Sequence, residues 1–103
     1  MQITVFTPTY NRAHLLPRLY KSLCAQTCKD FEWIIVDDGS ADNTKSIVDG
    51  FIHDCAITIR YFRQENGGKH RAINRGVKEA KGNLFFIAYS DDILPEKSIE
   101  TVL

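Results

Sequence analysis

Two pairs of adjacent carboxylates are the groups in this sequence best suited to metal or phosphate chemistry. Asp37-Asp38 ends the apolar run at residues 31–36, and Asp91-Asp92 follows a second apolar run at residues 84–89. Adjacent carboxylates at a strand end can hold a hard divalent cation, which keeps coordination positions open for phosphate oxygens. Four converging carboxylates without a cation would raise one another's pKa values. We therefore expect either a metal or a set of hydrogen-bond donors beside them.

Each acidic pair also has a purely structural explanation. Aspartate is common in turns and at helix N-caps, where its oxygens accept backbone N–H groups. The segment from Gly39 to Ser46 comes close to the phosphate-binding pattern G-x-x-x-x-G-K-S, but Thr44 replaces the second glycine. Because Asp37, Asp38 and Asp42 surround this loop with negative charge, the sequence argues against a phosphate-binding loop here.

A third polar cluster, Pro8-Thr9-Tyr10-Asn11-Arg12, follows the first β-rich run. Tyr10 offers an aromatic face that can stack on a nucleobase, and Arg12 offers a cation. Asp37 or Asp38 could accept a hydrogen bond from a ring N–H of such a base. The structural alternative makes Tyr10 a packed loop residue and Asn11 a helix cap.

A glycine turn followed by three potential cations forms the fourth polar segment, Asn66-Gly67-Gly68-Lys69-His70-Arg71. At the start of a helix, free N–H groups and the helix dipole favour anions. The alternative is an ordinary turn that leads into a solvated helix face.

The elements that must position these clusters alternate between strand and helix. The sequence predicts strands at residues 2–7, 31–36, 57–62 and 84–89, with Pro8 ending the first. It predicts helices at residues 15–24, after a cap at Ser40 or Asp42, at residues 69–80, and from Pro95. The runs at 31–36 and 84–89 are apolar almost throughout, as in strands covered on both faces, whereas residues 57–62 alternate as in an edge strand.

We therefore predict a Rossmann-like, three-layer α/β/α domain over residues 1–103, with a mainly parallel sheet in the order 3-2-1-4. The second helix is expected to bury Ile47, Val48, Phe51 and Ile52. In such sheets ligands bind outside the carboxyl ends of the strands, where the strand order reverses. The polar clusters that follow the first, second and fourth strands should therefore meet in one site.

Composition excludes several classes of protein. The chain has 103 residues, with 13 basic and 13 acidic side chains, so nothing favours binding to nucleic acid or to a charged membrane surface. No apolar run approaches the roughly 20 residues of a membrane span, and no signal peptide precedes the first strand. The three cysteines lack the spacing of a zinc site, so we expect them to be free thiols. Free thiols fit a reducing cytoplasm, so we expect a cytoplasmic location, or the inner face of the membrane for a full-length protein.

The end of the sequence predicts further chain and a partner. Leu103 closes an amphipathic segment without a cap, so we expect a single domain that is truncated after Leu103. In the predicted order, residues 84–89 form an edge strand without any charge, although natural edge strands are usually protected. We expect the fragment to form a homodimer that covers this edge.

Four segments together resemble a known family. They are Thr7-Pro8-Thr9-Tyr10-Asn11-Arg12, Ile35-Val36-Asp37-Asp38-Gly39-Ser40, Asn66-Gly67-Gly68 and Ser90-Asp91-Asp92. In order and spacing they are similar to the nucleotide-sugar-binding half of family 2 glycosyltransferases, which have the GT-A fold. The resemblance implies metal-assisted, inverting transfer of a sugar from a nucleotide-diphosphate sugar, a UDP-sugar above all. The acceptor would be a hydroxyl of a saccharide or a lipid-linked molecule, as in polysaccharide biosynthesis.

The resemblance also implies roles for individual residues. It assigns to the nucleotide Thr7, Pro8, Tyr10, Arg12, Asp37, Asp38, Lys69, His70 and Ser90. Asp38, together with Asp37, would contact the base. Asp91, with Asp92, would bind Mn²⁺ or Mg²⁺ as part of the family's D-x-D element, in which Tyr89 replaces the usual first acid. The catalytic base would lie beyond Leu103.

A phospho-receiver signalling domain is the alternative from a different functional class. Such a domain also carries an acidic pair after an apolar strand and uses it to hold Mg²⁺. There, however, the pair follows the first strand and a phosphorylated Asp ends the third. Here the pair follows the second strand, and the third run ends in Phe62-Arg63-Gln64. The sequence therefore favours the glycosyltransferase.

Overall fold

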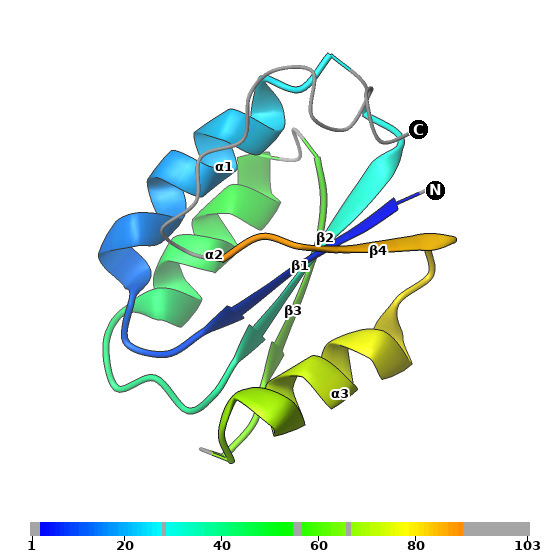
Figure 1. The fold of residues 1–103 in the computed structure, drawn as a ribbon. Helices are drawn as coiled ribbons and strands as arrows, with labels where there is room; N and C mark the ends of the chain where they lie inside the picture. Colours follow the sequence, from blue (N-terminus) through cyan, green and yellow to red (C-terminus); the bar gives the residue numbers. More distant parts are fainter. Residues whose placement is uncertain (1–2, 28, 55–56, 66, 90–103) are drawn as a thin grey trace.

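The computed structural model describes residues 3–27, 29–54, 57–65 and 67–89, in which strands and helices alternate (Figure 1). The strands are β1 (Ile3–Thr9), β2 (Phe31–Asp37), β3 (Thr58–Arg63) and β4 (Leu84–Ile87). The helices are α1 (Leu16–Cys24), α2 (Thr44–Asp54) and α3 (Lys69–Glu79), and a short 3-10 turn, η1 (Ala13–Leu15), precedes α1. The helix predicted from Pro95 falls outside the described residues.

The four strands form one parallel sheet in the predicted order, β3-β2-β1-β4. Val5 of β1 lies between Trp33 of β2 and Phe86 of β4. At the other end of the strands, Thr9 pairs with Asp37, which in turn pairs with Arg63. The carboxyl ends of β1, β2 and β3 therefore finish side by side at one edge of the sheet.

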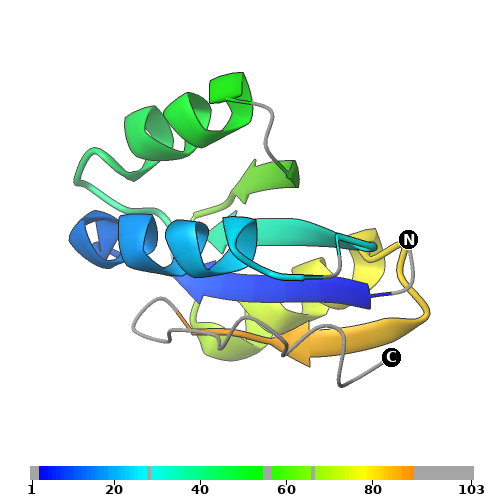
Figure 2. The ribbon, with the colours of Figure 1, turned by 90° about the horizontal axis from the view of Figure 1, so that it is seen from above.

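Helices cover both faces of this sheet, which gives the predicted three-layer architecture (Figure 2). On one face, Val5 and Trp33 pack with the leucines of α1 and with Phe51 of α2. On the other face, Phe6 packs with Ala72 of α3. Because successive residues of a strand point to opposite faces, a strand covered by helices on both sides is apolar nearly throughout.

The third helix lies close to the sheet at Gly76. A Cβ atom at this position would lie 2.3 Å from Cδ1 of Phe6, which is far shorter than any van der Waals contact. Glycine at this point thus lets α3 bring the start of the helix, and the glycine turn before it, against the strand ends.

The ends of β1 and β4 each differ from the prediction by two residues, and Pro8 explains both. Pro8 was expected to end the first strand, but β1 continues to Thr9 through its pairing with β2. The Phe6 carbonyl accepts the Ala88 N–H at 2.9 Å, so Phe6 and Pro8 both point their peptide groups toward β4. Pro8 has no N–H for the next bond of that ladder, and β4 ends at Ile87 instead of residue 89. The Thr7 hydroxyl supplies the missing donor, because it donates to the Ala88 carbonyl at 2.6 Å.

The buried face of α2 also differs from the prediction at two residues, Ile47, which is half-buried, and Ile52. Val48 and Phe51 are buried as predicted, and Thr44 at the start of the helix joins them. Ile52 was predicted to be buried, but 38% of it is exposed. One residue beyond Phe51 is rotated by about 100° around the helix, which takes Ile52 away from the sheet.

An unexpected buried charge lies at the amino-terminal edge of the sheet. Glu32 interrupts the apolar run of β2 and is fully buried. Its carboxylate accepts bonds from the Thr4 hydroxyl (2.7 Å), the Lys81 N–H (2.7 Å) and the Arg60 guanidinium (3.1 Å). Arg60 also donates to the carbonyl of Glu79 at 2.6 Å. Glu32 therefore ties β1, β2 and β3 to the connection between α3 and β4.

These donors control the ionisation of Glu32. Burial alone would raise its pKa, but the N–H of Lys81, the hydroxyl of Thr4 and the charge of Arg60 together hold the pKa below its usual value. The carboxylate thus stays charged at neutral pH inside the protein.

The outer edge formed by β4 is apolar, as the sequence predicted. Leu84 and Phe85 are 45% and 36% exposed. Self-association through this edge stays a prediction. Within the described part of the chain, no helix is long and apolar enough to cross a membrane.

Glu32→Gln should lower the free energy of unfolding by about 1–3 kcal/mol. The side-chain NH₂ of the glutamine would face hydrogen-bond donors, and those donors would then lack an acceptor. Urea denaturation at pH 7 measures this. Glu79→Gln is the control, since within the described residues the Glu79 side chain makes a solvent-accessible pair with Arg75 alone, and the substitution should cost at most about 1 kcal/mol. Equal losses in the two variants would contradict the role given to Glu32.

Candidate functional site

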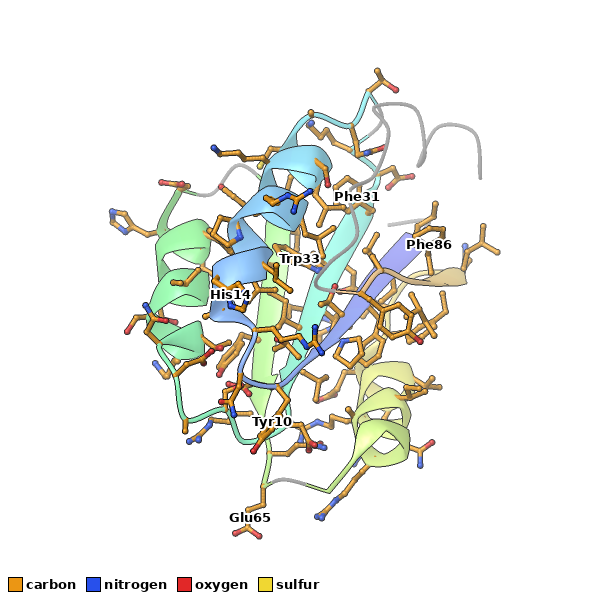
Figure 3. All side chains as sticks on the ribbon, turned by 60° about the vertical axis from the view of Figure 1, so that its left-hand side comes forward. Tyr10, His14, Phe31, Trp33, Glu65 and Phe86 are labelled. Carbon is orange, nitrogen blue, oxygen red and sulfur yellow. The ribbon has the colours of Figure 1, made fainter. Side chains whose placement is uncertain are left out.

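The candidate site is the edge of the sheet where β1, β2 and β3 end. Three connections meet there: residues 10–12 after β1, residues 38–43 after β2, and residues 64–65 and 67–68 between β3 and α3. Figure 3 shows Tyr10 and Glu65 at the same end of the sheet, although 55 positions separate them in the chain. The predicted strand order therefore brings these segments together.

Asp37 is buried at the end of β2 and its carboxylate organises the neighbouring chain. The Tyr61 hydroxyl donates to its Oδ2 at 2.6 Å, and the Ser40 N–H donates to its Oδ1 at 2.8 Å. The guanidinium of Arg63 lies 4.0 Å away. Burial, followed by the bond to Asp37, raises the pKa of Tyr61 well above its usual value, so this phenol stays protonated. Asp37 thus makes the turn contact expected of an aspartate that precedes Gly39-Ser40.

Asp38 gathers the donors of the glycine turn. The Gly67 N–H (2.9 Å) and the Gln64 side-chain amide (3.1 Å) donate to its Oδ1, and the Gly68 N–H (3.0 Å) donates to its Oδ2. Burial alone would raise the pKa of Asp38, but these donors and the positive charge of Arg71 hold it below its usual value. The set of donors expected beside the acidic pair is therefore present around Asp38.

This arrangement also explains the glycine turn. The sequence indicated that its N–H groups could receive an anion, and in the structure the carboxylate of Asp38 is that anion. Gly68 has a φ of 88°, a backbone conformation that residues with a side chain rarely adopt. Its N–H can point at Asp38 because glycine tolerates this conformation.

Tyr10 and Arg12 are both exposed beside the acidic pair, and 47% of Tyr10 is accessible. Tyr10 is therefore not the packed loop residue of the structural alternative. Asn11 between them is not a helix cap either, because its side-chain oxygen accepts the Ala41 N–H at 2.7 Å. The loop after β1 thus contacts the loop after β2, and the ring of Tyr10 stays exposed.

Thr7 and Pro8 lie deeper than Tyr10. Thr7 is fully buried: its hydroxyl accepts the Trp33 indole N–H at 2.9 Å and donates to the Ala88 carbonyl. Pro8 is half-buried. In this structure the Thr7 side chain joins β1, β2 and the end of β4, and a direct contact of Thr7 with a nucleotide stays a prediction. Thr9, for which the sequence pattern predicted no role, has a buried hydroxyl without a hydrogen-bonding partner in the described part of the chain.

The remaining predicted site residues either begin α3 or fall outside the described residues. Lys69 and His70 open α3 directly after the glycine turn. Ser90, Asp91 and Asp92 fall outside the described residues. Among the residues that are described, no three His, Cys, Asp or Glu side chains gather in a way that could hold a metal ion.

An open depression of about 470 Å³ lies next to the acidic pair, lined by Gly39, Arg63, Gln64 and Glu65. Sequence reasoning gave residues 63–65 no role in the site. The predicted order did contain the signal, since it set the third strand beside the second. Whatever follows the third strand must then border Asp37-Asp38.

The phospho-receiver alternative does not fit this geometry. Its acidic pair would follow β1, and an aspartate would end β3. In the structure Asp37 and Asp38 follow β2, and Arg63 and Gln64 stand at the end of β3, where both interact with the acidic pair.

Comparison with known proteins gives a family and several relatives. The sequence model described as Glycosyl transferase family 2 matches residues 4–103. The chain is 41% identical over 101 residues to glycosyltransferase GlyG of Streptococcus pneumoniae serotype 4, which covers 97% of this chain and 33% of GlyG. It is 37% identical over 93 residues to a PGL/p-HBAD biosynthesis glycosyltransferase of Mycobacterium bovis, which covers 90% of this chain and 36% of that protein. The chain thus spans about a third of the length of these relatives.

Solved structures agree with these relatives. Residues 1–349 of S. aureus TarS in complex with UDP-GlcNAc match with a TM-score of 0.91 and 28% identity, over 99% of this chain and 30% of that one. The mannosyltransferase PcManGT from Pyrobaculum calidifontis, in complex with GDP-Man and Mn²⁺, matches with a TM-score of 0.86 and 28% identity, over 91% of this chain and 28% of that one.

The lowered pKa of Asp38 predicts a loss of stability in acid. A carboxyl group with a lower pKa in the folded than in the unfolded state stabilises the fold above its unfolded value, about 3.9, and this stabilisation is lost as pH falls through the folded pKa. Asp38→Asn should therefore cost about 1–3 kcal/mol at pH 7 and reduce the further loss below pH ~4.

Urea denaturation at pH values from about 2.5 to about 7 measures this change in stability. Asp49→Asn is the matched control, because that carboxylate lies in an exposed pair with Lys45 and its removal should change stability by no more than about 0.5 kcal/mol. If Asp38→Asn kept the same acid dependence as the unchanged protein, the interpretation of these hydrogen bonds would be wrong.

Proposed function

Because this chain belongs to glycosyl transferase family 2 and has the fold of the nucleotide-binding half of GT-A enzymes, we propose that it binds the donor of a glycosyl transfer. The donor would be a nucleotide-diphosphate sugar. The sugar would pass, with inversion at the anomeric carbon, to an acceptor hydroxyl on a saccharide or a lipid-linked molecule. The observation that carries the proposal is the meeting of Tyr10, Asp38 and the depression beside Arg63 at one edge of the sheet.

The nucleoside would lie between the exposed ring of Tyr10 and the acidic pair. A base stacks on an aromatic face and gains about 1–3 kcal/mol from it. Asp38 is the better acceptor for a ring N–H, since it is 8% exposed whereas Asp37 is 1% exposed. Among the described residues, the Oδ2 atom of Asp38 accepts one bond, from Gly68, which leaves a lone pair for the base.

A low pKa suits Asp38 to this role. The carboxylate is held ionised by donors that approach from the glycine turn. An ionised acceptor makes a stronger hydrogen bond with a neutral ring N–H than a neutral amide would. Uracil has such an N–H, and TarS structures hold UDP and UDP-GlcNAc, which supports a UDP-sugar as the donor.

The diphosphate would extend from the nucleoside toward the segment that follows β4. Arg12 contributes an exposed positive charge on the loop after β1. Lys69 and His70 at the start of α3 are the further candidates for contact with the nucleotide, as the family resemblance implies. Ser90 is the corresponding candidate next to the acidic pair Asp91-Asp92.

The donor set at Asp91 and Asp92 suits a divalent cation. Carboxylate oxygens are the ligands that Mg²⁺ and Mn²⁺ prefer, and PcManGT was solved with Mn²⁺ beside GDP-Man. A cation held there would stabilise the negative charge on the departing diphosphate. Attack by the acceptor hydroxyl further requires a general base within hydrogen-bond reach. We propose a cytoplasmic location for this reaction.

Calorimetric titration of the full chain with UDP tests the proposal. UDP should bind, and Mn²⁺ should strengthen binding by about tenfold or more. Asp91→Ala should abolish the strengthening by Mn²⁺, because it removes a carboxylate ligand, while circular dichroism remains unchanged. Asp49→Ala is the control, since Asp49 is exposed on α2 and pairs only with Lys45 among the contacts described.

Equal Mn²⁺-dependent affinity for UDP in Asp91→Ala would contradict the metal assignment. Absence of any UDP binding, in a panel that also includes GDP, would contradict donor binding itself.

A further inference from the structure

Asn11 lies between two residues that the proposed function assigns to the nucleotide, yet its backbone N–H and its side-chain oxygen both bond within the protein. We propose that Asn11 is a positioning residue, which holds Tyr10 at the open edge of the site without itself touching the ligand. This inference rests on the proposed function, because it concerns how the same site is kept in shape.

The backbone of Asn11 has an unusual conformation. Its φ is 52°, and among the described residues it is the one residue other than glycine with a positive φ. Asparagine tolerates this left-handed region better than other residues that carry a side chain. The conformation turns the chain sharply between the end of β1 and η1, so that Tyr10 stays exposed while the next residues return to the protein.

Two reciprocal hydrogen bonds hold Asn11 against the loop after β2. Its N–H donates to the Ser40 hydroxyl at 2.8 Å, and its side-chain oxygen accepts the Ala41 N–H at 2.7 Å. We call this pair of bonds, between Asn11 and Ser40-Ala41, the loop clasp. A single residue thus fixes both the position and the direction of the loop that carries Tyr10.

The loop clasp is anchored on both sides. Ser40 donates its own N–H to Asp37, and its carbonyl accepts the Arg63 guanidinium at 2.9 Å. Two residues after Asn11, the Ala13 N–H donates to Asp42, whose other carboxylate oxygen accepts the Thr44 N–H at the start of α2. The loop carrying Tyr10 is therefore connected to the acidic pair through bonds that involve no ligand.

Burial separates positioning from direct contact. Ser40 is 5% exposed, and its hydroxyl is already the acceptor for Asn11. A ligand at the open edge therefore meets Tyr10, which is 47% exposed, before it could reach Ser40. If removal of the Ser40 hydroxyl weakens ligand binding as removal of the Asn11 side chain does, the effect must act through the loop.

The experiment compares UDP affinities of four single variants of the full chain by calorimetry: Asn11→Gly, Ser40→Ala, Tyr10→Ala and the control Ser46→Ala. Asn11→Gly keeps a residue that accepts the positive φ but removes the acceptor for Ala41. Asn11→Gly and Ser40→Ala should each weaken UDP binding about fivefold to tenfold, which corresponds to one lost hydrogen bond. Ser46 is exposed on α2, so Ser46→Ala should leave the affinity unchanged.

A double-mutant cycle with Tyr10 tests how Asn11 acts. If Asn11 works by holding Tyr10, then Asn11→Gly should change affinity by less than about twofold in a Tyr10→Ala background, because the ring it positions is gone. Full additivity of the two substitutions would overturn the proposal. So would unchanged UDP affinity in both Asn11→Gly and Ser40→Ala.

A measurement without ligand separates this inference from the proposed function. Hydrogen exchange of the Ala41 amide should be faster in Asn11→Gly than in the unchanged protein, whereas thermal unfolding of both should still be cooperative. Equal exchange rates would overturn the loop clasp whatever the ligand is. If the unchanged protein does not bind UDP, or if Tyr10→Ala binds UDP as tightly as the unchanged protein, the proposed function is wrong. The positioning role of Asn11 is then wrong as well.

Discussion

The burial of two carboxylates at the end of β2 is the constraint on which the site depends. A charged group taken out of water must find hydrogen-bond donors, or it costs several kcal/mol. Asp37 finds them in Tyr61 and Ser40, and Asp38 finds them in Gln64 and the two glycines of the turn before α3. Because these donors come from β3 and from the loops that follow β2 and β3, satisfying the two charges also brings those segments together.

A buried carboxylate with hydrogen-bond donors from several elements also lies at the opposite end of the strands, and it explains how the two ends of the sheet are connected. Glu32 is buried with Arg60, Thr4 and the Lys81 N–H, and so fixes where α3 ends and β4 begins. Gly76 lets α3 pack directly on Phe6 in between. The helix that brings the glycine turn to Asp38 is thus fixed at its far end as well, which leaves the loop containing Tyr10 as the part of the site held mainly by the Asn11 contacts.

The architecture could be predicted because apolar periodicity and right-handed crossovers restrict a chain of alternating strands and helices to few arrangements. The strand boundaries were harder to predict. Pro8 interrupts the pairing of β1 with β4 but leaves the pairing of β1 with β2 intact, and only the observed pairing shows which side its missing N–H would face. The burial of Glu32 could not be predicted from the apolar run that contains it. Whether a charged side chain can be buried depends on hydrogen-bonding partners that are distant in the sequence. For the same reason the roles of Tyr61 and Gln64 could not be predicted, although the strand order already set β3 beside the acidic pair.

We propose that the nucleotide binds at the end of the sheet formed by residues 10–12, residues 38–43, and residues 63–65 with 67–68. Amide NMR of the full chain, titrated with UDP in the presence of Mg²⁺, tests this most directly because it needs no substitution and reports on every part of the sheet. We expect the largest shifts in those three segments, while amides around Glu32 at the opposite end of the strands stay unchanged. Shifts that concentrate on β4 and α3, with residues 10–12 and 38–43 unaffected, would contradict it.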